Sequence, residues 1–224
     1  MYDDLDFALQ EIIEERVSIL FEIEKAIFTR RYSFSSKHQD IFSTQSISML
    51  YSIWESFVQK SFNLYIDELN ERNIKFHDFC DEIVVHCMEI HFKQFRDYPT
   101  TPNKKIKFFG TLKEFHSSDT FLIPRVVNTE SNVGFHVLNR LLKSFSLEPF
   151  PEHWEKYTHP NSNLKESMRL FLRLRNTVAH GGDLVSEDKI DQHLYVRFKE
   201  MVIDLMYEVR LKMLNAIKNE TFLK

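Results

Sequence analysis

The sequence predicts an all-α fold: a bundle of about five main helices joined by long irregular connections. Two observations support this prediction. Apolar residues, 43% of the chain, recur mostly at three- and four-residue steps, which is the spacing of amphipathic helices. Only 4 glycines and 6 prolines occur in 224 residues, whereas an all-β chain needs turn residues at roughly every 8–12 positions. Because each apolar stripe needs a partner that buries it, residues 1–224 are expected to form one helical domain.

The first three helices are expected in the first 95 residues. The first covers residues 1–29, and a serine-containing connection continues to residue 40. This helix is acidic: residues 1–24 carry eight acidic side chains against Arg16, a charge of −7, whereas the whole chain carries −4. The second helix is expected over 41–70 and the third over 76–95, because both segments carry apolar stripes at helical spacing.

The second half of the chain is expected to alternate irregular stretches with helices. Residues 97–134 contain three prolines and Gly110, which predicts a long irregular insertion. A short helix follows Ser131, and a second irregular stretch covers 146–162.

The next helix, 164–182, has signals at both ends. Asn163 followed by Glu166 has the pattern of a capping box, and Gly181-Gly182 can take the left-handed conformation that ends a helix. The last helix is expected to begin at Ser186, because the two acids that follow suit the positive end of a helix.

Composition excludes several classes of protein. The glycines are too few and too scattered for a Gly-rich phosphate loop. No apolar run reaches the ~18 residues of a membrane span, and the acidic start does not resemble a signal peptide. Two cysteines cannot form a disulfide framework. These features predict a cytoplasmic protein with no membrane partner.

The third helix contains four residues of types that bind metals: His77, Cys80, Cys87 and His91. On an ideal helix the first pair lies about 15 Å along the axis from the second pair, so one ion cannot be held by all four. We therefore expect buried thiols in an apolar stripe rather than a zinc site, and no other cofactor.

The 164–182 helix carries a polar face opposite its core side. Arg169, Arg173, Asn176 and His180 share this face on an ideal wheel. Asn176 and His180 are four residues apart, so the amide could orient the imidazole. Arg175 instead falls on the flank of the core side, about 140° from His180. Only a distorted last turn or a second copy of the helix could bring Arg175 and His180 into one site.

The segment Arg175-Asn176-Thr177-Val178-Ala179-His180 resembles the signature of the HEPN superfamily, in which an arginine precedes a histidine near a helix end. Two other segments extend the resemblance. Residues 50–58 (LYSIWESFV) look like the aromatic early helix of prokaryotic HEPN nucleases of the RiboL-PSP group, and residues 135–142 (FHVLNRLL) are similar to the short helix before their motif helix. The resemblance covers about 45–215.

This resemblance implies a homodimer in which the two 164–182 helices face each other and cleave RNA without a metal. His180 would be the general acid/base, Arg175 the clamp on phosphate and transition state, and Asn176 an orienting group. These roles suit the residue types, because His transfers protons near neutral pH and Arg binds phosphate oxygens bidentately. Arg169 and Arg173 either contact the RNA or form a solvated face. Stand-alone prokaryotic members are commonly toxins or antiphage-defence effectors, so an antitoxin or sensor partner is also implied.

Other interpretations stay open. A HEPN bundle can be catalytically inactive and bind nucleotide or RNA, or assemble with a protein partner. A structural helical adaptor with a coincidental RNxxxH string is a third possibility. The basic run 104–107 is expected to be a solvated loop, and contact with an RNA backbone is the alternative. Tyr51, Trp54 and Phe57 are expected in the core rather than stacked on bases.

Overall fold

The protein is described by a computed structural model that covers residues 2–29, 31–92, 94, 97–117, 121–156, 163–181 and 189–224. Within these residues seven α-helices and no β-strand occur, which confirms the all-α prediction. The helices are α1 (Tyr2–Phe28), α2 (Ser36–Glu71), α3 (Asp81–His91), α4 (Pro102–Ser117), α5 (Phe135–Ser144), α6 (Leu164–Ala179) and α7 (Gln192–Asn219). None of the helices in these ranges is long and apolar enough to span a membrane.

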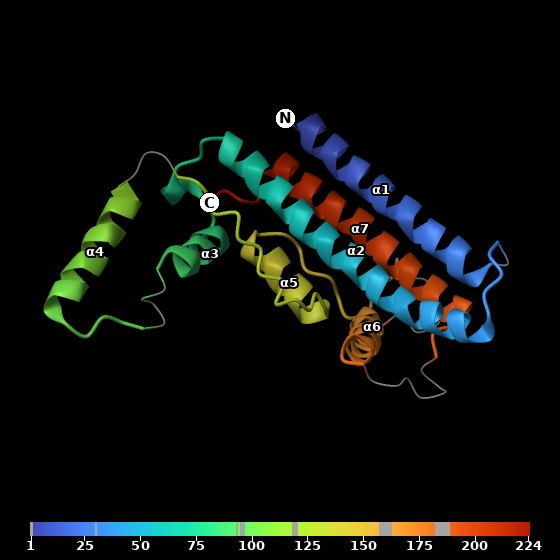
Figure 1. Ribbon diagram of the computed structural model, residues 1–224. Coiled ribbons are helices and arrows are strands. Elements are labelled where there is room, and N and C mark those ends of the chain that lie inside the picture. The colour runs from blue at the N-terminus through green and yellow to red at the C-terminus, as the bar shows by residue number, and fades with distance from the viewer. Residues whose placement is uncertain are drawn as a thin grey trace.

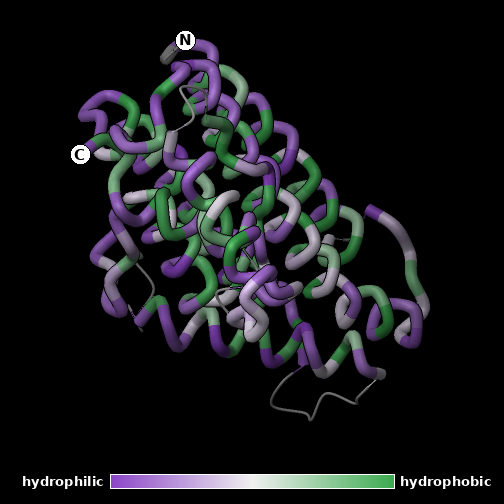
Figure 2. Tube along the Cα trace, turned by 90° about the vertical axis from the view of Figure 1, so that its left-hand side faces the viewer, coloured by the Kyte–Doolittle hydropathy of each residue, from purple (hydrophilic) through white to green (hydrophobic). Residues whose placement is uncertain are grey.

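Three long helices, α1, α2 and α7, pack side by side and form the body of the molecule (Figure 1). Hydrophobic residues gather in the middle of the molecule and hydrophilic residues on its outside (Figure 2). Polar contacts also join the first and last helices. The hydroxyl of Tyr195 donates to the carbonyl of Leu20 at 3.0 Å, and Lys199 Nζ forms an ion pair with Glu24 at 2.5 Å. Both Tyr195 and Lys199 are buried, so these contacts lie inside the bundle.

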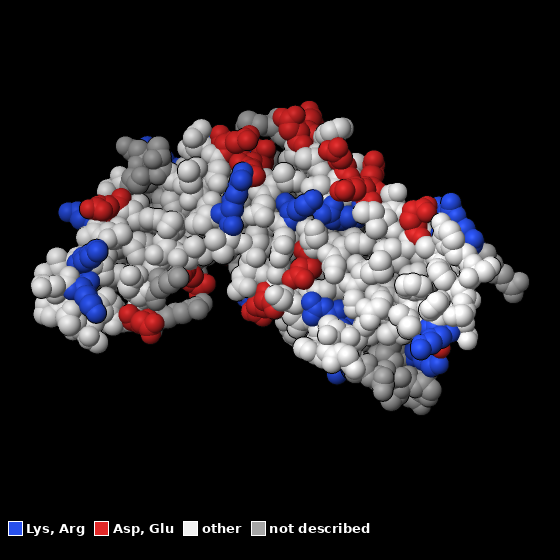
Figure 3. Space-filling model, in the orientation of Figure 1, with Lys and Arg blue, Asp and Glu red and all other residues white. Residues whose placement is uncertain are grey.

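The outward side of α1 is acidic, as its composition predicts. Acidic side chains gather along the edge of the molecule where α1 lies (Figure 3). The opposite side of the helix carries Leu9, Ile13 and Leu20, which are completely buried. The helix therefore closes the core with one side and presents negative charge with the other.

Helix α2 begins earlier than predicted, at Ser36 rather than near residue 41. The Ser35 side chain accepts a hydrogen bond from the backbone N–H of His38 and caps the helix. Tyr51, Trp54 and Phe57 are buried, which confirms their expected place in the core.

The side chains of Trp54 and Tyr51 attach the segment before α5 to helix α2. Trp54 Nε1 donates to the carbonyl of Val133 at 3.0 Å. The Tyr51 hydroxyl accepts from the N–H of the same residue at 2.8 Å. Both backbone groups of Val133 are thus bonded to α2, and this residue is itself buried.

The prediction of one helix over 76–95 is wrong in its first part. A 3-10 turn over Phe76–Asp78 comes first, and α3 begins only at Asp81. Cys80 and Cys87 are both buried, as expected, and burial raises the pKa of the Cys87 thiol to about 12. Among the described residues no group of three or more His, Cys, Asp or Glu side chains is placed to hold a metal ion.

The segment 97–134 is not irregular throughout, which corrects the prediction. Helix α4 occupies its centre and carries the basic run 104–107, so that run is helical rather than a loop. Figure 1 shows α4 at one end of the molecule, away from α1 and α7. Its Phe108 ring packs edge-on against Phe92 at a centroid distance of 5.8 Å. An aromatic contact thus attaches α4 to the residue that follows α3.

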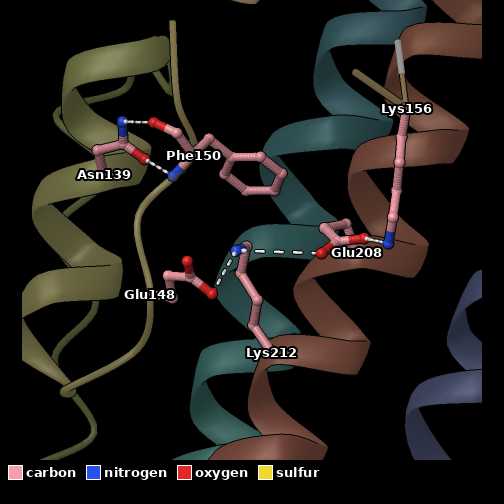
Figure 4. A network of polar contacts seen from close by, with 6 residues as sticks. All are labelled: Asn139, Glu148, Phe150, Lys156, Glu208 and Lys212. Atoms are coloured by element: carbon pink, nitrogen blue, oxygen red, sulfur yellow. Dashed lines mark hydrogen bonds and ion pairs between the residues drawn. The ribbon is translucent and has the colours of Figure 1, made fainter. Parts of the chain in front are cut away.

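The described part of the 146–162 stretch is irregular, as predicted, and side chains hold it in place (Figure 4). Asn139 of α5 bonds both backbone groups of Phe150, at 2.8 and 2.9 Å. Lys212 of α7 lies between Glu148 and Glu208, at 3.9 and 4.0 Å. The segment is therefore attached to α5 on one side and to α7 on the other.

The last helix begins later than predicted. Asp191 caps α7 by accepting from the N–H of Leu194 at 2.7 Å, and the first helical residue is Gln192. Ser186, where the start was expected, lies outside the described residues.

Candidate active site

Helix α6 has the ends that the sequence predicts. The Asn163 side chain accepts a hydrogen bond from the N–H of Glu166 at 3.0 Å, and the helix begins at Leu164. At the other end, Gly181 has φ +70°, the left-handed conformation that suits glycine, and its N–H donates to the carbonyl of Val178. Gly182 lies outside the described residues.

One side of α6 is seated in the core. Phe171 is buried, and its ring lies 5.1 Å from that of Phe198 in α7 and 6.0 Å from that of Tyr51 in α2. Leu174 and Val178 are buried on the same side. This packing fixes the rotation of α6 and therefore decides which of its polar side chains face outward.

The opposite side of α6 is polar and open to solvent. Arg169, Arg173 and His180 are exposed, and Asn176 is half-buried. Arg169 forms an ion pair with Glu166 at 2.6 Å. The imidazole of His180 makes no hydrogen bond or ion pair with the described part of the chain, while the backbone N–H of this residue donates to the carbonyl of Asn176 at 3.1 Å.

Arg175 is half-buried on the flank of the core, and three contacts hold its guanidinium. The guanidinium carbon lies 3.9 Å from the centre of the Tyr51 ring, a close cation–π distance. Nη2 donates to the carbonyl of Ser131 at 3.1 Å, and Nη1 donates to Oδ1 of Asn176 at 2.8 Å. Asn176 therefore binds the arginine of the motif rather than its histidine, which differs from the expectation that this amide orients the imidazole.

Tyr51 and its neighbour Glu55 also contact the segment before α5. Burial raises the pKa of the Tyr51 hydroxyl to about 12, against a hydrogen bond from Val133 that lowers it, and the nearby Glu55 adds to the increase. Glu55 in turn accepts from the hydroxyl of Thr129 at 2.9 Å. The segment 129–133 is thus bonded to α2 at Glu55 and Tyr51 and to α6 at Arg175.

Three residues outside the predicted set also contribute to this site: Tyr51, Glu55 and Ser131. Tyr51 and Glu55 do belong to the 50–58 segment that carries part of the family resemblance, which is a signal that could have pointed to them. Ser131 contributes only a backbone carbonyl, and no residue type in the sequence marks such a contact.

The raised pKa of Tyr51 predicts a loss of stability at alkaline pH. Below pH ~10 the phenol is neutral in both states; between about 10 and 12 it ionises only in the unfolded chain, so the free energy of unfolding falls as pH rises. A shift of two units corresponds to roughly 2–3 kcal/mol. Urea unfolding across this pH range measures the slope. Tyr51→Phe, which cannot ionise, should show a smaller slope than the parent; equal slopes would contradict this prediction.

The end of α6 therefore places an exposed imidazole and an anchored guanidinium within six residues of each other. The imidazole can transfer protons near neutral pH, and the guanidinium can bind an anion. On an ideal helix the two side chains still point about 140° apart, which leaves them on different sides of α6 in a single chain.

A family model matches most of the chain. The model of a family described as HEPN_MAE_28990-like HEPN matches residues 8–222, nearly the whole chain and all seven described helices from the second turn of α1 onward. No curated protein and no solved structure gives a significant match.

Proposed function

The chain belongs to the HEPN_MAE_28990-like HEPN family, and on that premise we propose that it is an endoribonuclease that cleaves RNA without a metal ion. One observation carries the proposal: the RNxxxH string lies at the end of α6, where His180 is exposed and Arg175 is anchored through Tyr51, Ser131 and Asn176. Phosphodiester cleavage needs both an exposed proton-transfer group and a fixed cation, and α6 carries them on two different sides.

In the proposed reaction the 2′-oxygen of the ribose forms a bond to phosphorus while the bond from phosphorus to the 5′-oxygen breaks. The products are a 2′,3′-cyclic phosphate and a 5′-hydroxyl. His180 takes the proton from the 2′-hydroxyl or supplies one to the leaving 5′-oxygen. Arg175 stabilises the charge on the phosphorane, and Asn176 orients the guanidinium. DNA lacks the 2′-hydroxyl and is not a substrate for this route.

We further propose that the enzyme acts as a homodimer, with the α6 helices of two copies facing each other across a two-fold axis. Such an interface supplies a second imidazole and a second guanidinium. His180 of one copy can then lie near Arg175 of the other, although the two point about 140° apart on one helix. Exposed apolar side chains at the start of α2 and just before it suit an interface: Tyr32, Ile41, Phe42 and Met49. Figure 1 shows α6 against this part of α2. Native mass spectrometry tests the dimer, and a strict monomer would count against it.

By analogy with stand-alone prokaryotic relatives we propose a cytoplasmic toxin or antiphage-defence effector, controlled by an antitoxin or sensor protein. Induced expression should then arrest bacterial growth, and the His180→Ala variant should not. Growth that is equally unaffected by both proteins would remove the support for this role.

The cleavage proposal is tested by incubating the purified protein with single-stranded RNA in EDTA and analysing the product ends. We expect fragments that end in 2′,3′-cyclic phosphate, and no cleavage of an oligonucleotide with the same sequence made of DNA. Cleavage that requires an added divalent ion, or products with 3′-hydroxyl ends, would show that the proposed chemistry is wrong.

A second candidate function is an inactive HEPN module that binds RNA or nucleotide, or assembles with a protein. It is favoured by the contacts of Arg175, whose guanidinium is engaged within its own chain on the far side of α6 from His180. Such a module would shift RNA in a binding assay without shortening it.

A further inference from the structure

A small pocket lies between the start of α5 and the outward face of α6. It has a volume of about 200 Å³ and is lined by Asn132, by residues 134–137 at the start of α5, and by Lys165, Arg169 and Leu172 of α6. We refer to it as the α5–α6 pocket. Its volume is below the range of about 300–1,000 Å³ that is typical of sites for drug-sized ligands, so it suits a single small group.

The α5–α6 pocket is close to the motif both along the face of α6 and through the segment before α5. Its three α6 residues lie within an arc of about 60° that also contains Asn176, so pocket and motif share one face of the helix. Along the axis, Arg169 precedes Asn176 by about 10 Å at 1.5 Å per residue. Asn132 directly follows Ser131, whose carbonyl accepts from Arg175. A strand of RNA that reaches His180 along this face therefore passes the pocket.

Three basic side chains line the α5–α6 pocket: Lys165, Arg169 and His136. The lysine is paired with Glu152 at 2.7 Å and the arginine with Glu166 at 2.6 Å. Both carboxylates are about half exposed. Exposed ion pairs contribute only about 0–1 kcal/mol, so a phosphate can replace these carboxylates at little cost.

The remaining lining suits a flat ring with a polar edge. Leu172, Phe135 and Val137 supply apolar surface. Oδ1 of Asn132 is buried and has no hydrogen-bond partner in the described ranges, and a buried amide oxygen without a partner is uncommon. A nucleobase presents both an apolar face and a hydrogen-bonding edge.

The larger neighbouring cavity, of about 850 Å³ between α3 and α5, is a poor path for the strand. It shares Phe135 and His136 with the α5–α6 pocket, and α5 adds the cations Arg140 and Lys143. Four carboxylates outnumber these cations: Asp81, Glu82 and Glu89 of α3, and Glu152. Carboxylates repel the phosphates of RNA, so the strand is expected to remain on the α6 side.

We propose that the α5–α6 pocket binds one nucleotide of a single-stranded RNA that flanks the cleaved bond. The base lies against the apolar lining with its edge on Asn132, and the phosphate lies on Arg169 and Lys165. This inference rests on the proposed function for its substrate, and it adds a subsite that selects the base.

The test measures binding separately from cleavage. All variants carry His180→Ala, and the probes are fluorescently labelled oligoribonucleotides made only of A, only of C or only of U. In this background Arg169→Ala should weaken binding about tenfold. It should also reduce the slope of the logarithm of the binding constant against the logarithm of the salt concentration by about 0.7, the contribution of one single-strand phosphate contact. Asn132→Ala should reduce the difference in affinity among the three probes. Arg125→Ala, which removes the same charge from an exposed pair with Asp67 outside the pocket, should bind like the parent.

The outcomes separate this inference from the nuclease proposal. If the native protein cleaves RNA but Arg169→Ala and Asn132→Ala bind all probes like Arg125→Ala, the subsite is wrong and the nuclease stands. If the native protein does not cleave, yet both pocket variants lose affinity or base preference, the subsite stands without the nuclease. Equal parental affinity for all three probes would overturn selection of the base. Because Arg169 is exposed, its replacement does not endanger folding.

Discussion

Replacement of His180 by alanine is expected to reduce RNA cleavage by about 10²–10⁴-fold, the usual contribution of a positioned proton-transfer group. The imidazole is exposed at the end of α6 and has no partner among the described side chains, so its removal should leave the fold and thermal stability unchanged. Initial rates of cleavage of a labelled RNA in EDTA, measured for both proteins at equal concentration, give the ratio.

His77→Ala is the matched control for this prediction. His77 is also an exposed histidine, with 66% of its side chain accessible, and it lies on the 3-10 turn before α3 rather than on α6. The His77→Ala variant should cleave RNA at the parental rate. Undiminished cleavage by His180→Ala would mean that another group transfers the proton and that the assignment of this residue is wrong.

Replacement of Trp54 by alanine is expected to lower the free energy of unfolding by about 3–5 kcal/mol. The indole is completely buried in α2, so truncation leaves a cavity in the centre of the bundle. It also removes the donor to the carbonyl of Val133. Urea unfolding followed by far-UV circular dichroism measures the loss.

The Trp54→Phe variant separates the two contributions. It keeps most of the buried ring but leaves the carbonyl of Val133 without this donor, which should cost about 1–3 kcal/mol. Because Val133 is two residues from Ser131, this variant should also loosen the contact that holds Arg175 and reduce cleavage. A cost below about 1 kcal/mol for Trp54→Ala would contradict the buried position of the indole.

The apolar stripe alone predicted α1, end signals predicted α6, and a proline misled the prediction at α4. Asn163 directly precedes α6 and Gly181 follows it by two residues, so both signals lie next to the helix. The bounds of α6 were therefore predicted to within a few residues. Pro102 was interpreted as a helix breaker, but it is the first residue of α4, where a proline costs nothing because that N–H has no partner in any case. Gly110 lies in the middle of the same helix and is exposed, with open space where a Cβ would lie.

The candidate site could also be predicted only in part. The helical wheel predicted that Arg175 lies on the flank of the core and that His180 faces outward, because both depend only on position along one helix. The partners of Arg175 could not be predicted, since Tyr51 and Ser131 are 124 and 44 residues away and meet it only through tertiary packing. The amide of Asn176 was expected to orient His180, four residues later, but it accepts from the adjacent Arg175, whose position depends on that packing.

The polar contacts between α1 and α7 have a consequence for synthesis of the chain. Asp6 pairs with Arg210, 204 residues later, and Glu24 pairs with Lys199, 175 residues later. Helix α1 can pack against α2 early, but its contacts with α7 form only after α7 has been made. Helix α6 leaves the ribosome before Phe198, against which its core side packs. A nascent chain thus carries the complete RNxxxH segment before α7 supports it, so the candidate site is fully packed only after α7 has been made.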